Sequence, residues 1–186
     1  MEPQTPANEA ARLEVLHQFE VLDTDPEQTF DDITRLAAYI CHTPIAIITL
    51  VDAHRQWFKS RVGLSFAETA RDVSFCAYAI KQPGPMVVRD ALDDERFRDN
   101  PLVRADPYIR FYAGSPLTTV EGFSLGTLCV IDRYPREITP EQMTALRVLS
   151  QQVMTQLELR RTIRSLTRSV NHAKQKVNEL EQRLKN

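Results

Sequence analysis

The C-terminal quarter of the sequence holds the feature that most limits its fold. From Glu141 to the last residue there is no glycine or proline, so neither of the residues that most often interrupt helices occurs there. The stretch follows Thr139 and Pro140, where a threonine cap, a proline at the first helical position and Gln142 at the third form a capping box. A helix of about 45 residues would be roughly 70 Å long, too long to pack wholly on one small domain. We therefore predict a helix that extends beyond it.

The second half of this helix has the spacing of a coiled coil. Apolar residues alternate by three and four at Ile163, Leu166, Val170, Ala173, Val177, Leu180 and Leu184. Mostly β-branched residues at position a and mostly leucine at d favour a parallel two-stranded coiled coil, in which Lys176 at g faces Glu181 at e of the partner. Upstream, residues 146, 149, 153 and 157 drift off the heptad, so this half is expected to pack on the domain. The alternative, a lone amphipathic helix, would leave the stripe exposed.

Charge is unevenly spread along the chain, whose net charge is −2. Residues 160–186 contain eight Lys or Arg and two Glu, a net charge of +6, so the first 159 residues carry −8. This asymmetry predicts two regions with different roles. A basic tail could contact nucleic acid or anionic lipid. The charges are spread around the helix, however, which favours a solvated helix face, and we expect no nucleic-acid partner.

The remaining segments are shorter and mix two periodicities. We expect helices over residues 8–22, 29–43 and 72–81, and strands over 45–51, 55–62, 86–88, 110–120 and 123–132. Short turns such as Glu121-Gly122 join consecutive strands into hairpins. These features predict an α+β domain on an antiparallel sheet. The sequence has neither of the glycine-rich motifs of dinucleotide and P-loop sites.

The stretch from Phe30 to Arg160 resembles the GAF domains of bacterial signalling proteins, the kind found before histidine kinases and diguanylate cyclases. The matching segments are FDDITRLAAYIC, TPIAIITLVDAHRQWFKSRVGL, RDVSFCAYAI, VVRDALDDERFRDNPLV, IRFYAGSPL and LGTLCVID. The resemblance implies a PAS-like fold, with a six-stranded antiparallel sheet, helices on one side and a small-ligand pocket on the other. We accordingly expect a lead-in helix in residues 1–28, a GAF core in 29–138 and a long helix in 139–186 that becomes a coiled coil from about residue 160.

The motifs of ligand-binding GAF domains give no ligand for this chain. The Asn-Lys…Phe…Asp-Glu signature of cyclic-nucleotide binders is missing. Bilin-binding members carry a pocket cysteine often followed by histidine, but Cys76 is followed by Ala77, and Cys41-His42 precedes the first strand. Haem would need a pocket histidine, and none lies between His54 and His172. We therefore expect no bilin, haem or cyclic nucleotide, and the scattered histidines predict no metal site.

Strand alternation suggests which residues would line the pocket. In residues 110–114 it places Arg110, Tyr112 and Gly114 on one sheet face, where the arginine could hold an anion and the glycine leave room. The polar stretch 89–106 is either a lid over the pocket or a solvated loop with local ion pairs. The candidate pocket residues are Phe75, Cys76, Tyr78, Asp90, Phe97, Arg110, Tyr112 and Gly114.

Cys76 could be a nucleophile or a small buried side chain. Arg71 and the start of its own helix could activate it mildly, but no histidine is close in sequence. Its position on an apolar helix face favours burial, so we predict no catalytic residues and no enzyme. One enzymatic alternative remains, a free methionine sulfoxide reductase of the GAF fold, which uses cysteines around such a pocket.

Together these features predict a homodimeric cytoplasmic sensor. No apolar run is long enough to span a bilayer, the N-terminus lacks a secretory pattern, and three widely spaced cysteines favour reduced thiols. We expect a small-ligand or redox signal to pass through the coiled coil to an output kinase or diguanylate cyclase outside this sequence, in two-component or cyclic di-GMP signalling. The alternative is a dimerisation module without a ligand.

Overall fold

The structure is a computed structural model that describes residues 8–185, with only the backbone at positions 177, 180 and 183–185. Its elements, in chain order, are α1 (Glu9–Gln18), α2 (Gln28–Cys41), β1 (Ile45–Val51), β2 (Arg55–Val62), β3 (Glu68–Ala70), α3 (Phe75–Ala79), β4 (Met86–Val88), α4 (Pro101–Arg104), β5 (Phe111–Thr118), β6 (Ser124–Asp132) and α5 (Pro140–Lys185).

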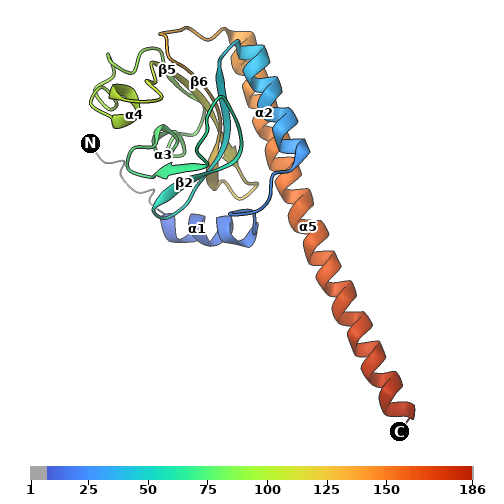
Figure 1. Cartoon of the computed structure of the whole chain (residues 1–186). Helices are drawn as coiled ribbons and strands as arrows, with labels where there is room; N and C mark the ends of the chain where they lie inside the picture. Colours follow the sequence, from blue (N-terminus) through green and yellow to red (C-terminus); the bar gives the residue numbers. More distant parts are fainter. Residues whose placement is uncertain (1–7, 186) are drawn as a thin grey trace.

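The six strands form one antiparallel sheet in the order β3-β2-β1-β6-β5-β4. Helices α2 and α5 lie side by side along one face, α1 lies at the lower end of the sheet in this view, and α3 and α4 lie on the opposite side (Figure 1). The predicted α+β class and GAF arrangement are therefore confirmed.

Both faces of the sheet are buried, which explains the unbroken apolar run of β1. Ala46, Ile48 and Leu50 point into the core beneath α1, α2 and α5, whereas Ile45, Ile47 and Val51 point into the core beneath α3 and α4. A strand covered on both faces has no solvent side and so shows no alternation of apolar and polar residues. The domain consequently has two separate cores.

Helix α5 is 46 residues long and begins where the capping box predicts. The backbone N–H of Gln142 donates to Thr139 Oγ1 over 3.2 Å, and the backbone N–H of Thr139 donates to Gln142 Oε1 over 3.1 Å. Leu146, Val153 and Leu157 are buried against the sheet, while the second half continues past the domain (Figure 1). The break in the apolar pattern thus marks where the helix leaves the sheet.

Several helix boundaries predicted from local sequence signals are wrong. α1 ends at Gln18 rather than residue 22, and Asn8 makes no side-chain cap. α3 spans only five residues, because Ser74 rather than Asp72 caps it by accepting from the Ala77 N–H. The polar stretch contains a helical turn, α4, capped by Asn100. The short strand β3 was not predicted, because its three residues show no apolar alternation.

Candidate functional site

The predicted pocket residues lie on the α3 side of the sheet, where aromatic rings pack against one another. The rings of Phe75 and Phe97 stack with centroids 3.9 Å apart, and Phe75 also stacks on Tyr112 at 5.3 Å. Tyr78 meets Phe97 edge-on at 4.9 Å. Phe75, Phe97 and Tyr112 are fully buried. The structure therefore brings these four rings together, in contact with one another.

Tyr112 and Gly114 share the sheet face that alternation predicts, but the tyrosine fills the space beside the glycine. A Cβ atom at Gly114 would lie 2.2 Å from Tyr112 Oη. The absence of a side chain at Gly114 therefore makes room for the ring of Tyr112.

Little free volume remains among these side chains. The cavity next to Cys76 and Cys129, lined also by Ile47, Phe75 and Tyr112, measures about 20 Å³. Small-molecule pockets usually measure about 300–1,000 Å³, whereas one water needs roughly 10–15 Å³. In this conformation the cavity admits a molecule of about the size of water.

Arg110 and Asp90 pair with each other at the rim of this region. Arg110 Nε and Nη2 donate to the two carboxylate oxygens of Asp90 over 2.7 and 2.5 Å. The hydrogen bond from Arg110 lowers the pKa of Asp90. Asp94 and Arg96 pair in the same way nearby. Of the two alternatives for residues 89–106, a lid or a loop with local ion pairs, this geometry resembles the loop.

Cys76 is buried beside a second thiol. Its Sγ lies 3.9 Å from Cys129 Sγ and accepts from Thr127 Oγ1 over 3.1 Å and from Tyr112 Oη over 3.5 Å. Burial would raise the pKa of Cys76, but hydrogen bonds from Cys129, Thr127, Thr49 and Tyr112 outweigh it and lower this pKa to about 6. Burial and the neighbouring Cys76 raise the pKa of Cys129 well above its ordinary value. The sequence predicted the burial of Cys76 but gave no sign that Cys129 lies beside it.

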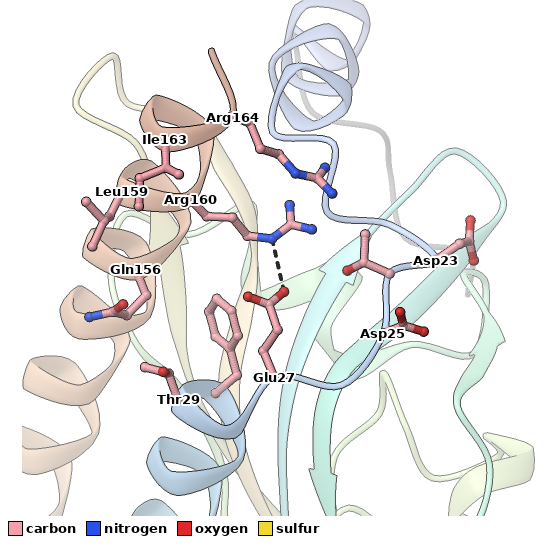
Figure 2. A pocket seen from close by; sticks show the side chains of 11 residues that line it. Asp23, Asp25, Glu27, Thr29, Gln156, Leu159, Arg160, Ile163 and Arg164 are labelled. Carbon is pink, nitrogen blue, oxygen red and sulfur yellow. Dashed lines mark hydrogen bonds and ion pairs between the residues drawn. The ribbon is translucent and has the colours of Figure 1, made fainter. Parts of the chain in front are cut away.

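A second hollow, which sequence reasoning missed, lies between α5 and the linker that joins α1 to α2. It has a volume of about 610 Å³. Figure 2 shows Asp23 and Asp25 on the linker side, Arg160 and Arg164 on α5, and the ion pair of Arg160 with Glu27 between them. The sequence shows the acidic residues in 23–27 and the arginines at 160, 164 and 168, but it gives no sign that the two groups lie close together.

The contacts around this hollow tie α5 to the body of the domain. Lys59 is fully buried and donates through Nζ to Glu27 Oε1 over 2.6 Å, and Arg160 Nε donates to the same oxygen over 3.0 Å. Arg164 Nη1 donates to the Glu20 carbonyl over 2.8 Å, and Arg168 pairs with the Glu20 carboxylate. Burial would raise the pKa of Glu27, but Lys59 and Arg160 lower it.

The second half of α5 presents an apolar stripe. Leu159, Ile163, Leu166 and Val170 are each 51–61% exposed, and Ala173 is exposed as well. The predicted heptad side chains of Val177, Leu180 and Leu184 lie outside the described residues. Nearer the domain, Leu36, Tyr39 and Val148 are also exposed.

None of the helices described is long and apolar enough to cross a membrane. Within residues 8–185, no group of three or more His, Cys, Asp or Glu side chains could hold a metal ion.

Comparison with known proteins gives one family and one curated relative. The family model described as the GAF domain matches residues 25–157. The cyclic di-GMP phosphodiesterase PA2567 of Pseudomonas aeruginosa is 46% identical over 144 residues, which are 77% of this chain and 24% of that protein. The chain therefore spans about a quarter of that relative's length.

Solved structures share the fold at low sequence identity. The GAF domain of an Acinetobacter phosphoenolpyruvate-protein phosphotransferase superposes with a TM-score of 0.60 at 15% identity, covering 83% of this chain and 98% of the other. A domain of a two-component sensor histidine kinase protein from Sinorhizobium meliloti gives 0.59 at 15%, covering 76% and 97%. A free methionine-R-sulfoxide reductase from Neisseria meningitidis also gives 0.59 at 15%, covering 86% and 97%. Identities this low establish the fold alone.

Proposed function

Because the chain belongs to the GAF domain family, we propose that it is a sensory or regulatory module that dimerises through α5 and relays a change in its core to an output partner. The observation that carries this proposal is the structure of α5. Its first half is buried on the sheet, and its second half projects with the exposed apolar residues Leu159, Ile163, Leu166 and Val170 in heptad spacing.

A second copy of the chain is the occupant that fits this stripe. Heptad spacing of apolar residues matches another helix of the same spacing, and isolated exposed stripes of this length are unfavourable in water. Nearer the domain, Val148 of α5 and Leu36 and Tyr39 of α2 are exposed as well. We propose a parallel homodimer in which the two α5 helices pair and the α2 helices flank them.

The output that we propose is cyclic di-GMP signalling. The support is the relative named as a cyclic di-GMP phosphodiesterase, whose matching part is about a quarter of its length. In this proposal the present chain supplies the regulatory input, and a further domain or partner protein in the cytoplasm carries out the chemistry. A kinase output is the alternative.

The filled core favours a relay without a bound small molecule over a ligand sensor. Phe75, Phe97 and Tyr112 occupy the space beneath α3, and about 20 Å³ remains beside them. We propose no enzymatic activity for the domain itself. The methionine sulfoxide reductase alternative predicts thiol-dependent turnover of free methionine sulfoxide by the purified protein, and measuring that turnover tests it.

Light scattering on the purified chain at tens of micromolar tests the dimer. We expect the mass of two chains for the wild type and of one chain for the Ile163→Asp, Leu166→Asp double variant, because two charges per chain would enter the apolar seam. Ser165→Asp is the matched control, since the serine is exposed at position c on the outer side of the pair. A monomeric wild type would refute the proposal.

A further inference from the structure

We propose that Cys76 and Cys129 form an oxidisable thiol pair that closes to a disulfide when hydrogen peroxide enters the cavity beside them. This inference deepens the proposed relay function by naming its input, an oxidant in place of a bound ligand. It starts from the juxtaposition of two buried thiols whose sulfurs are 3.9 Å apart on the same side of the sheet.

Closing the bond needs a small movement of one element. A disulfide has an S–S length of about 2 Å, so the sulfurs must approach by roughly 2 Å. Cys129 is fixed in the centre of β6, where it pairs with Ile47 on one side and Gly114 on the other. Cys76 belongs to α3, a helix of five residues between two loops. Movement of α3 toward the sheet is therefore the route to the bond.

The surroundings of Cys76 suit it to attack an oxidant. The thiolate is the nucleophile in thiol oxidation, and the hydroxyls of Thr127 and Tyr112 both donate to this sulfur. These donors replace some of the hydration that a buried thiolate loses. The hydrogen bonds also lower the pKa of Cys76, in agreement with this geometry.

The size of the cavity limits which oxidants can reach the two thiols. It borders both sulfurs and measures about 20 Å³, which is enough for about one water-sized molecule. Hydrogen peroxide is only slightly larger than water, whereas the aromatic stack of Phe75 and Phe97 leaves no space for a bulky organic hydroperoxide.

The chemistry balances with hydrogen peroxide as the only co-reactant. The Cys76 thiolate attacks one peroxide oxygen and becomes a sulfenic acid, and the departing hydroxide takes up the proton that the Cys76 thiol released, which gives one water. Cys129 then attacks the sulfenic sulfur, forms the S–S bond and loses its proton as the sulfenic oxygen leaves in a second water. Two thiols are oxidised by two electrons, and one peroxide is reduced.

The disulfide would affect the aromatic stack beside α3 and lie close to the core that contains α5. Movement of α3 shifts Phe75 within its stack against Phe97 and Tyr112. On the other face of β6, Leu128 and Val130 belong to the core that α5 shares. The thiol pair is therefore separated from the core that contains α5 by a single strand.

The test treats the purified, reduced chain with hydrogen peroxide and then with an alkylating agent under denaturing conditions. We expect titratable thiols to fall from three to one, the intact mass before alkylation to fall by two hydrogen atoms, and a non-reduced digest to yield a linked peptide pair containing residues 76 and 129. Dithiothreitol should reverse all three changes. The rate with cumene hydroperoxide should be at least tenfold lower.

Cys41→Ser is the matched control, because Cys41 lies in the other core, and this variant should form the same link. Cys76→Ala and Cys129→Ala should not form it, with circular dichroism reporting whether each variant folds. The wild-type digest decides the question even if a variant fails to fold. Loss of no thiols, oxygen addition without a link, a link that includes Cys41, or equal rates with both peroxides would overturn the proposal.

Light scattering of the same samples separates this inference from the proposed dimer. A monomer that forms the link refutes the dimer and leaves the thiol pair intact. A dimer that never forms the link refutes only the thiol pair.

Discussion

Arg160, in the middle of the long helix, donates a hydrogen bond to Glu27, the residue just before α2, over 3.0 Å. The buried Lys59 of β2 binds the same carboxylate oxygen. One carboxylate therefore joins α5, the sheet and the linker near the point where α5 leaves the domain.

Replacing this carboxylate should destabilise the fold. Glu27→Gln keeps the shape but leaves the Lys59 ammonium buried without its counter-charge. Removing one partner of a fully buried pair costs roughly 3–5 kcal/mol. Because Glu27 is 39% exposed, we expect the free energy of unfolding to fall by only about 1–2 kcal/mol, measured by urea denaturation at pH 7.

Glu95→Gln is the matched control for that variant. Glu95 is 89% exposed and pairs with Arg98 at the surface, so its loss should change the free energy of unfolding by less than about 0.5 kcal/mol. Equal effects of the two variants would contradict the bridging role of Glu27.

Glu9 should make stability depend on pH. Burial would raise the pKa of Glu9, but hydrogen bonds from Arg12 and Arg71 and their charges lower it below its ordinary value of 4.5. A lowered carboxylate pKa gives stability that is present above the ordinary value and lost as the pH falls through the folded-state pKa. Glu9→Gln should therefore cost about 2 kcal/mol at pH 7, and the difference from wild type should shrink below pH 4.5.

Urea denaturation at several pH values between 7 and 3 measures this difference. Glu14→Gln, on the exposed side of the same helix, should cost less than about 0.5 kcal/mol at pH 7. A Glu9→Gln penalty that stays constant down to pH 3 would mean that the carboxylate charge does not stabilise the fold.

A methyl group at Gly114 should disturb the packed core. In Gly114→Ala the new Cβ would lie 2.2 Å from Oη and 2.7 Å from Cζ of the fully buried Tyr112, so the ring must shift. Such overpacking costs typically about 1–3 kcal/mol, and we expect Tm to fall accordingly in a thermal melt. Gly84→Ala is the control, since nothing lies within 4 Å of its new Cβ, and its Tm should stay within about two degrees of wild type.

Features encoded in neighbouring residues were predictable. The start of α5 depends on the reciprocal hydrogen bonds of Thr139 and Gln142, three positions apart, and the two-sided burial of β1 follows from its unbroken apolar run. The face shared by Tyr112 and Gly114 follows from the period of a strand. That the tyrosine ring lies over the glycine depends on a side-chain rotamer, which alternation does not fix.

Features that join distant segments were not predictable from a single sequence. The arginines at 160, 164 and 168 are spaced by four on one side of a helix, but their acceptors at Glu20 and Glu27 lie more than 130 positions away. Likewise, Cys76 and Cys129 are 53 positions apart and meet only because α3 packs on β6. The residues of each pair are visible in the sequence, but only the folded structure shows that they are in contact.

The length of α5 beyond its ion pair of Arg168 with Glu20 has a mechanical consequence. The helix continues to Lys185, which at 1.5 Å per residue makes an arm of roughly 26 Å. A tilt of about 5° at this attachment would displace the far end by about 2 Å. In the proposed dimer, a small rotation of α5 on the sheet would therefore become a displacement at its end that is large enough to change which residues of the two helices are in contact.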